Sequence, residues 1–208
     1  MARTKVGIIG AGNMGSAFAK RLGAAGHEVT ITARDPAHAE QAAAAAGGSV
    51  RAVRVDEIAR GAEVLILATY FPDAPDALRN AGDLAGKTVV DITNPVTPDM
   101  SGLSVGHTTS AAEEIQKTVP AARVVKAFNT VFAQVLGSGA RAQVFYAGDD
   151  AGAKEAVRAL IESAGLEPVD AGPLANARQL EPLGLLNIYF GYVAGRGTGV
   201  APAWVSVA

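Results

Sequence analysis

Short apolar runs alternate with helical patterns over most of the chain. Residues 6–9 and 64–68 are continuous apolar runs, the form taken by strands that are buried on both faces. Residues 13–25 instead carry apolar side chains at helical spacing and end at Gly26, which is typical of a helix C-terminus. Because strands and helices alternate, we expect parallel β-α-β units. The predicted fold class is α/β, a doubly wound, mostly parallel sheet with a small C-terminal helical extension.

The same pattern sets the expected boundaries of the elements. Strands are predicted at residues 6–9, 28–33, 64–68, 88–92, 123–128, 143–147 and 166–170. Helices are predicted at residues 13–25, 36–46, 72–84, 111–119, 151–164 and 176–189, with a further short element at 53–60. Residues 94–106 are interrupted by prolines, glycines and serines. They are expected to form a long irregular connection, and such connections in compact domains are often functional.

A glycine pattern follows the first predicted strand. Residues 10–15 read G-x-G-x-x-G and open the first helix of a β-α-β unit. In this context Gly10 allows the tight turn, Gly12 lets a pyrophosphate approach the backbone, and Gly15 lets the helix pack closely on the strand. The helix N-terminus adds unpaired N–H groups and a partial positive charge. The pattern predicts a Rossmann dinucleotide-binding site; the alternative is a glycine turn that holds no ligand.

The end of the second predicted strand indicates which dinucleotide binds. NAD-binding sites usually place Asp or Glu there to hold the ribose hydroxyls, whereas this chain has Thr32 followed by Arg34. A guanidinium can hold a 2′-phosphate that a carboxylate would repel. NADP is therefore favoured over NAD. The alternative is that Arg34 is a solvated surface charge and that Asp35 serves the ribose.

Two further strands end at the same edge of the predicted sheet, where ligands of open α/β folds bind. Thr69 and Tyr70 follow the strand at 64–68, and Tyr70 with Phe71 either flanks the cofactor or packs under the next helix. The strand at 88–92 ends in an Asp-Ile-Thr-Asn-Pro-Val segment at 91–96, whose polar atoms and proline-fixed backbone are expected near the nicotinamide.

Composition excludes several other classes of protein. The chain has 208 residues, with 18 Lys and Arg against 20 Asp and Glu, so no basic field exists to hold nucleic acid or anionic lipid. No cysteine is present, which excludes a disulfide framework, a thiolate nucleophile and a cysteine metal site. No histidine or carboxylate grouping has metal-ligand spacing, so no metal is expected. Apolar runs stop well short of the ~20 residues of a membrane span, so we expect a cytoplasmic protein without a membrane partner.

Several longer segments carry a resemblance that covers essentially the whole chain. The segments are residues 10–15, 32–34, 94–95, 110–114, 124–129 and 172–183. In this order they resemble the NADPH-dependent F-420 reductase family, the coenzyme F-420-dependent NADP oxidoreductases, whose fold also appears as the cytosolic domain of membrane ferric reductases. The Val-Lys-Ala-Phe-Asn and Gly-Pro-Leu-x-Asn-Ala-Arg segments are more distinctive than the glycine loop.

The resemblance implies hydride transfer between NADP(H) and a deazaflavin (coenzyme F-420) or a flavin that stacks on the nicotinamide. It also implies cofactor-binding roles by matching position. The pyrophosphate would be held by Gly10, Ala11, Gly12, Asn13, Met14 and Gly15, and the 2′-phosphate by Thr32 and Arg34. The nicotinamide would be lined by Thr69, Tyr70, Asn94, Pro95 and Val96, and the floor of the crevice by Ala127, Phe128 and Asn129.

No residue stands out as a catalytic acid or base. Such chemistry depends on orientation and water exclusion more than on a general acid, because the cofactors carry the electronics. His107, in the loop before the helix at 111–119, is a weak catalytic candidate that is expected to reach the substrate pocket. Lys126 and Arg178 lie within the resembling segments, and each either holds an anionic group of the substrate or forms a structural salt bridge.

The acceptor remains open among three interpretations. The first is the NADPH-dependent oxidoreductase acting on F-420 or a flavin, the second an NADPH reductase of a small C=O or C=N (imine or pyrroline-type) substrate, and the third an NADP-binding sensor without turnover. We expect one globule in which residues 1–170 form the NADP-binding Rossmann domain and residues 171–208 complete the substrate pocket. The apolar helix around 183–190 predicts a homodimer, and Trp204 is expected to be buried.

Overall fold

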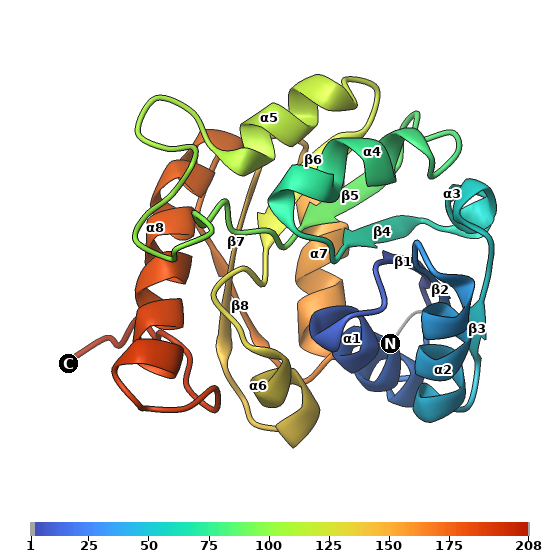
Figure 1. Cartoon of the computed structure of the whole chain (residues 1–208), viewed down its shortest axis with the longest axis horizontal. Coiled ribbons are helices and arrows are strands. Elements are labelled where there is room, and N and C mark those ends of the chain that lie inside the picture. The colour runs from blue at the N-terminus through green and yellow to red at the C-terminus, as the bar shows by residue number, and fades with distance from the viewer. Residues whose placement is uncertain (1–2, 208) are drawn as a thin grey trace.

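The structure, a computed structural model, describes residues 3–207. Its centre is an eight-stranded sheet with the order β3-β2-β1-β4-β5-β6-β7-β8 (Figure 1). Neighbouring strands from β3 to β6 pair in parallel, β7 is antiparallel to β6, and β8 is parallel to β7. The doubly wound, mostly parallel α/β fold with a C-terminal helix is therefore confirmed.

The strands are β1 (Lys5–Ile9), β2 (Glu28–Thr32), β3 (Val50–Ala52), β4 (Val64–Leu67), β5 (Thr88–Asp91), β6 (Arg123–Ala127), β7 (Gln143–Gly148) and β8 (Glu167–Asp170). The α-helices are α1 (Asn13–Ala24), α2 (Pro36–Ala46), α3 (Ile58–Gly61), α4 (Ala74–Arg79), α5 (Ala111–Thr118), α6 (Ala133–Ser138), α7 (Ala151–Ser163) and α8 (Ala177–Ile188). The 3-10 turns are η1 (Val55–Glu57), η2 (Phe71–Asp73) and η3 (Leu174–Asn176), and η4 (Tyr189–Val193) is a π-helical turn.

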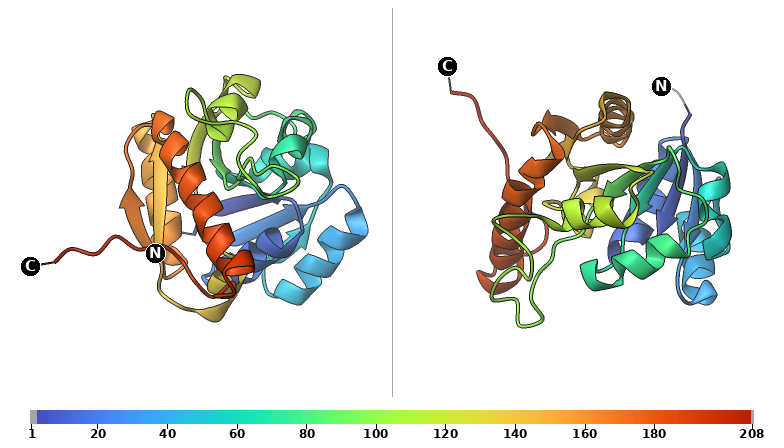
Figure 2. Two further views of the ribbon diagram at one scale, coloured as in Figure 1. Left: turned by 60° about the vertical axis from the view of Figure 1, so that its left-hand side comes forward. Right: turned by 90° about the horizontal axis from the view of Figure 1, so that it is seen from above.

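Helices cover both faces of the sheet. Side chains of α1, α2, α6 and α7 form one core cluster with residues such as Ile8 of β1, while α3, α4 and α5 form a second cluster that includes its neighbour Ile9. Successive strand residues point to opposite faces, so a fully buried strand supplies both clusters. α8 stands at the β7–β8 end of the molecule, opposite α2 and β3, and the last residues extend away from the body (Figures 1 and 2).

Several elements differ from the prediction. The edge strand β3 and the six-residue helix α6 were not predicted, because three and six residues are too few for a clear period. The helix predicted at 72–84 consists of η2 and α4 and ends at Arg79, since the chain then turns at Gly82, whose φ is +90°. The short element predicted at 53–60 is η1 followed by α3.

The expected burial of Trp204 is wrong. Trp204 is 77% exposed. The backbone of Trp204 is held instead: its N–H donates to Gln143 Oε1 at 2.6 Å, and Gln143 Nε2 donates to its carbonyl at 3.1 Å. The side chain of a β7 residue thus anchors the tail while the indole stays outside.

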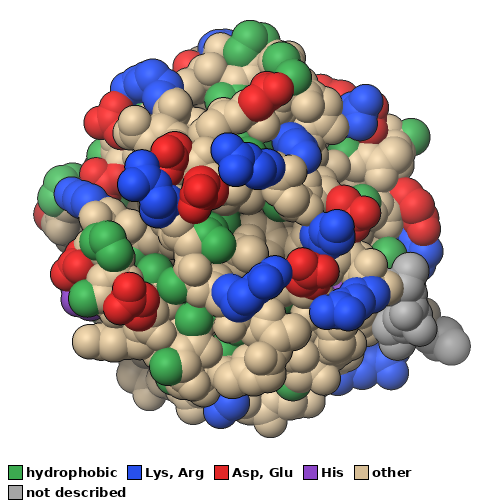
Figure 3. Space-filling view, turned by 90° about the vertical axis from the view of Figure 1, so that its right-hand side faces the viewer, with side chains coloured by type: hydrophobic (Ala, Val, Ile, Leu, Met, Phe, Trp, Pro, Cys, Tyr) green, Lys and Arg blue, Asp and Glu red, His purple; other side chains and the backbone are tan. Residues whose placement is uncertain are grey.

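The face over α2 and α3 carries positive and negative side chains in an interspersed pattern (Figure 3). This agrees with the nearly balanced composition, in which the formal net charge is −2. Within residues 3–207, no helix combines the length and apolar character that crossing a membrane requires.

His27, the residue before β2, is expected to make stability fall in mild acid. Burial lowers its pKa from the usual value of 6.5. Its Nδ1 accepts from the Thr4 N–H at 3.2 Å, and Nε2 lies 2.7 Å from Ser163 Oγ, which itself donates to Leu160 O, so these partners suit a neutral ring with its proton on Nε2. Below about pH 6.5 the unfolded chain binds the proton more readily, so the stabilisation is lost as pH falls from there toward the lower native pKa.

Urea unfolding between about pH 7.5 and pH 5 measures this effect. The difference in unfolding free energy between the wild type and His27→Gln should narrow as pH falls, because glutamine does not titrate. His38→Gln is the matched control, since His38 is exposed. A difference that stays constant across this range would contradict the assignment.

Candidate functional site

The glycine loop joins β1 to α1 at the carboxyl edge of the sheet. Gly10 has φ +112°, and a Cβ there would lie 2.3 Å from Ala68 O. A Cβ on Gly15 would lie 1.8 Å from Gly10 O, whereas one on Gly12 would meet nothing within 4 Å. Gly10 and Gly15 therefore serve the turn and its packing, and the space over Gly12 is open to a ligand.

The N-terminus of α1 faces this open space without a side-chain cap. Gly12 is the N-cap residue, and the first turn contains no acidic residue. By contrast, α2, α5 and α7 are each capped by a side chain, those of Asp35, Ser110 and Asp150. The unpaired N–H groups and the positive end of the helix dipole make the start of α1 suited to an anion such as a pyrophosphate.

The end of β2 lies beside this loop, because the Gly10 N–H donates to Thr32 O at 2.8 Å. Thr32 is buried, and the Arg34 side chain is 90% exposed and pairs with Asp73 of η2 at 3.4 Å. Asp35 accepts from the Ala37 N–H at 3.0 Å and thereby caps α2. Arg34 is thus an exposed surface cation beside the glycine loop, and Asp35 already has a structural role.

Thr69 and Tyr70 follow β4 and take different positions. Thr69 lies against the glycine loop, 3.5 Å from the position of a Cβ on Gly10, and its buried Oγ1 has no hydrogen-bond partner. Tyr70 is 81% exposed, so it does not pack in the core. Phe71 is half-buried against the cluster under α3, α4 and α5, which resolves its role as packing.

The residues after β5 and β6 are joined by their amide groups. Asn94 Nδ2 donates to Asn129 O at 2.7 Å, and Asn129 Nδ2 donates to Asn94 Oδ1 at 3.0 Å and to Leu180 O at 2.7 Å. Gly184 of α8 faces this pair so closely that a Cβ would lie 2.4 Å from Asn94 Oδ1. The Asn94 amide therefore connects the ends of β5 and β6 and packs against α8, so both of its polar atoms already have partners in the protein.

The connection after Asn94 has more order than expected. Pro95 is buried, and Val96 forms an isolated antiparallel bridge with Leu103. At the tip of this loop, hydroxyl groups of Thr97 and Ser101 donate to the Asp99 carboxylate and lower its pKa to about 2. The predicted irregular segment is thus a small hairpin-like loop.

Ala127 is the last residue of β6, and Phe128 follows it at the carboxyl edge of the sheet. Both are almost fully buried, and Phe128 adopts φ +60°, an unusual conformation for a bulky residue. Its ring meets Phe18 of α1 edge to face, with the centroids 4.9 Å apart. The end of β6 is therefore packed against α1, the helix that follows the glycine loop.

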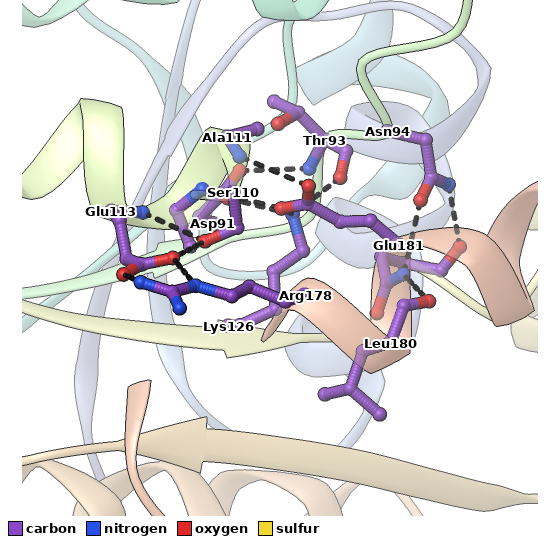
Figure 4. A network of polar contacts seen from close by, with 12 residues as sticks. Asp91, Thr93, Asn94, Ser110, Ala111, Glu113, Lys126, Arg178, Leu180 and Glu181 are labelled. Carbon is purple, nitrogen blue, oxygen red and sulfur yellow. Dashed lines mark hydrogen bonds and ion pairs between the residues drawn. The ribbon is translucent and has the colours of Figure 1, made fainter. Parts of the chain in front are cut away.

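A buried ion network lies behind the ends of β5 and β6 (Figure 4). Lys126 Nζ is 2.8 Å from Asp91 Oδ2, 2.8 Å from Glu181 Oε1 and 2.6 Å from Thr93 O, so each of its three protons has an acceptor. All three charged side chains are 0% or 1% exposed. Such a network is stable only when its members are fully paired.

The remaining oxygens of the two carboxylates are also satisfied. Asp91 Oδ1 accepts from the Thr93 N–H at 2.8 Å, and Glu181 accepts from the Ala111 and Ala112 N–H groups at 2.9 and 3.2 Å. The positive end of the α5 dipole thus offsets the second negative charge. The network joins β5, β6, α5 and α8, and so fixes α8 against the strand ends.

Arg178 has a comparable role beside α5. Its Nε and Nη2 hold the Glu113 carboxylate at 2.9 and 2.6 Å, and this contact lowers the pKa of Glu113. The Ser110 side chain accepts from the Glu113 N–H at 3.2 Å, which confirms the N-terminus predicted for this helix. Of the two alternatives for Lys126 and Arg178, the structure shows the structural salt bridge in both cases.

Four buried side-chain atoms in the described part of the chain have no hydrogen-bond partner. They are Thr69 Oγ1, Thr93 Oγ1, Asn129 Oδ1 and Thr130 Oγ1. All four follow β4, β5 or β6, at the edge of the sheet where the glycine loop lies. Buried polar atoms are normally paired, so this set marks the edge as a place where a bound ligand would complete the hydrogen bonding.

His107 is exposed, with φ +61°, in the loop before α5. Across residues 3–207, no group of three or more histidine or carboxylate side chains could hold a metal ion.

The sequence analysis assigned no role in this region to Glu181 or Gly184. One signal was available for Glu181: Lys126 sits between apolar residues of a buried strand, and a buried lysine needs an acidic partner. The sequence alone did not indicate which of the 20 acidic residues that partner is. Gly184 had no signal, because its close contact depends on how α8 docks.

The fold and the site define a class of protein, the dinucleotide-binding Rossmann domain. The fit rests on the free space at Gly12, the uncapped start of α1, the cation of Arg34 and the unpaired polar atoms at the strand ends. The comparisons with known proteins identify the family. The chain belongs to the NADP oxidoreductases described as coenzyme F420-dependent, and the sequence profile of that family matches residues 5–95.

Three known proteins are similar to the chain over most of its length. A solved structure from Arthrobacter sp. FB24, provisionally named an F420-dependent NADP-reductase, is 33% identical, with a TM-score of 0.83 over 94% of this chain and 96% of that one. The F420-dependent NADP reductase of Methanothermobacter marburgensis is 29% identical over 201 residues, covering 86% of this chain and 88% of the relative. Metalloreductase STEAP3 of Rattus norvegicus is 34% identical over 187 residues, which cover 88% of this chain.

The relatives differ in how much of them the chain matches. The chain spans 37% of the length of the rat metalloreductase and 38% of the human metalloreductase STEAP2. It spans nearly the full length of the Arthrobacter protein.

Proposed function

We propose that this protein transfers a hydride between NADPH and a deazaflavin, coenzyme F-420, or a flavin. The observation that carries the cofactor assignment is the open glycine loop at the uncapped start of α1 with the Arg34 cation beside it. NADPH supplies the hydride. The chain then has to bind the phosphates, orient the nicotinamide and exclude water.

Individual residues take up these tasks. The N–H groups at the start of α1 bind the pyrophosphate over Gly12, and Arg34 binds the 2′-phosphate. The side chains of Thr69 and Asn129 offer unpaired buried oxygens to the polar groups of the cofactor. The Asn94–Asn129 pair holds α8 over the strand ends and so limits access of water.

The acceptor is supported by the relatives. The Methanothermobacter protein is named an F420-dependent NADP reductase, and the chain aligns with 88% of it. Lys126 forms ion pairs with Asp91 and Glu181, so none of these three charged groups is available to bind or protonate a substrate. Reduction of a deazaflavin or flavin ring suits such a site, because the ring itself carries the electronics of the reaction.

Anaerobic oxidation of NADPH by the purified protein tests the acceptor. F-420, FMN, FAD, riboflavin and cyclic imines are offered separately, and NADH is the control donor. Turnover of F-420 or a flavin supports the proposal. Turnover of an imine alone would replace it by a C=N reductase, and binding of NADPH without any turnover would indicate a sensor.

Arg34→Ala is expected to weaken NADPH binding by about 1.5–3 kcal/mol, the contribution of a charge-assisted hydrogen bond. Binding of NADH should change little, because NADH has a hydroxyl group in place of the 2′-phosphate. Titration of both cofactors measures the two dissociation constants. Arg79→Ala is a matched control, since Arg79 is an exposed arginine that pairs with Asp76. An unchanged NADPH constant would remove Arg34 from the site.

We also propose that the protein is a homodimer in the cytoplasm, without a nucleic-acid or membrane partner. The end of α8 and η4 leaves Leu186, Tyr189, Tyr192 and Val193 at least 48% exposed, which is an unusually apolar surface. A second copy would cover it. Light scattering should give twice the chain mass of 21.0 kDa; a monomer mass at all concentrations would contradict the dimer.

A further inference from the structure

An ion pair lies at the edge of the sheet beside the glycine loop. Arg34 follows β2, and Asp73 ends the η2 turn after β4. β2 and β4 are the two neighbours of β1, and the glycine loop continues from β1. Arg34 Nη2 lies 3.4 Å from Asp73 Oδ2. The pair therefore bridges the two connections that flank the glycine loop.

The pair is a weak contact that can exchange for another partner. The Arg34 side chain is 90% exposed and the Asp73 side chain 49% exposed. Exposed ion pairs contribute little to folding and are screened by salt. Asp35, the other carboxylate near Arg34 in sequence, is engaged in capping α2. Asp73 is thus the carboxylate that occupies the guanidinium.

We propose that Asp73 competes with the 2′-phosphate of NADPH for Arg34, and that it thereby lowers NADPH affinity and its preference over NADH. This inference rests on the proposed function, because it requires Arg34 to bind the 2′-phosphate. A phosphate monoester carries nearly two negative charges at neutral pH. When it binds, Asp73 gives up its contact with Arg34, and its carboxylate then repels the phosphate. NADH brings no such charge.

Asp73→Asn tests this competition. It should lower the dissociation constant of NADPH about two- to fivefold in low salt, the range expected for one exposed pair. The constant for NADH should not fall, and the gain for NADPH should shrink at about 0.5 M salt. Asp76→Asn is the matched control: it removes the same charge three residues along, from a carboxylate that pairs with Arg79.

The outcomes distinguish a failure of this inference from a failure of the proposed NADPH site at Arg34. Unchanged or weaker NADPH binding by Asp73→Asn overturns the inference, and so does an equal gain by Asp76→Asn, which would be a general charge effect. In an Arg34→Ala background the gain from Asp73→Asn should shrink, and a gain of full size there also overturns competition. If Arg34→Ala leaves NADPH binding unchanged, the proposed 2′-phosphate site itself is wrong. If Arg34→Ala weakens NADPH binding but Asp73→Asn does not tighten it, only the inference about Asp73 is wrong.

Discussion

Replacing Lys126 by methionine is expected to lower the free energy of unfolding by about 3–5 kcal/mol. The lysine ammonium is fully buried and bonded to Asp91, Glu181 and Thr93 O. Methionine has a similar length but no charge, so it would leave two carboxylates buried near each other without a cation. Because domains are commonly stable by only about 5–15 kcal/mol, this loss would take much of the total.

Denaturant unfolding measures the effect, with Lys20→Met as the control, since Lys20 is exposed on α1. The control should change stability by at most about 0.5 kcal/mol. Where Lys126→Met alone does not fold, a variant that also carries Asp91→Asn and Glu181→Gln removes the stranded charges and should recover part of the stability. Equal stability of Lys126→Met and the wild type would contradict the importance of the network.

Much of the fold could be predicted from the sequence because its signals are local. The apolar runs at β1 and β4 are short and continuous, and the alternation with helices leads directly to a parallel sheet. The N-cap at Ser110, the proline at the first position of α2 and the glycine loop are likewise patterns within a few residues. β3 and α6 were missed because their three and six residues carry too little periodicity.

The less predictable parts depend on contacts between distant residues. Lys126 lies 35 residues from Asp91 and 55 residues from Glu181 along the chain. Local sequence patterns therefore do not show that these three residues pair. The antiparallel direction of β7 depends on how the chain returns after α6, and spacing does not reveal it. Trp204 is exposed because only its backbone is held, by Gln143, 61 residues away.

A contrast between two glycines of one loop separates ligand binding from folding. Gly12→Ala should leave stability near that of the wild type, because φ −73° is ordinary for alanine and a Cβ would meet nothing within 4 Å. The same methyl group would occupy the space through which a pyrophosphate approaches the α1 N–H groups. Losing one or two charge-assisted hydrogen bonds, at about 1.5–3 kcal/mol each, weakens NADPH binding at least about tenfold.

Gly15→Ala, in contrast, should lower the stability of the fold first and NADPH binding only as a consequence. Its Cβ would lie 1.8 Å from Gly10 O, a backbone atom that can move only if α1 shifts away from β1. Unfolding experiments should show the loss of stability directly, and cofactor titration shows binding falling with it. If Gly12→Ala binds NADPH as tightly as the wild type while remaining stable, the cofactor does not approach over Gly12. Because a Cβ on Gly12 would touch no protein atom within 4 Å, a loss of NADPH binding by Gly12→Ala can be assigned to direct obstruction of the ligand. A variant that also destabilises the loop, such as Gly15→Ala, does not allow this assignment.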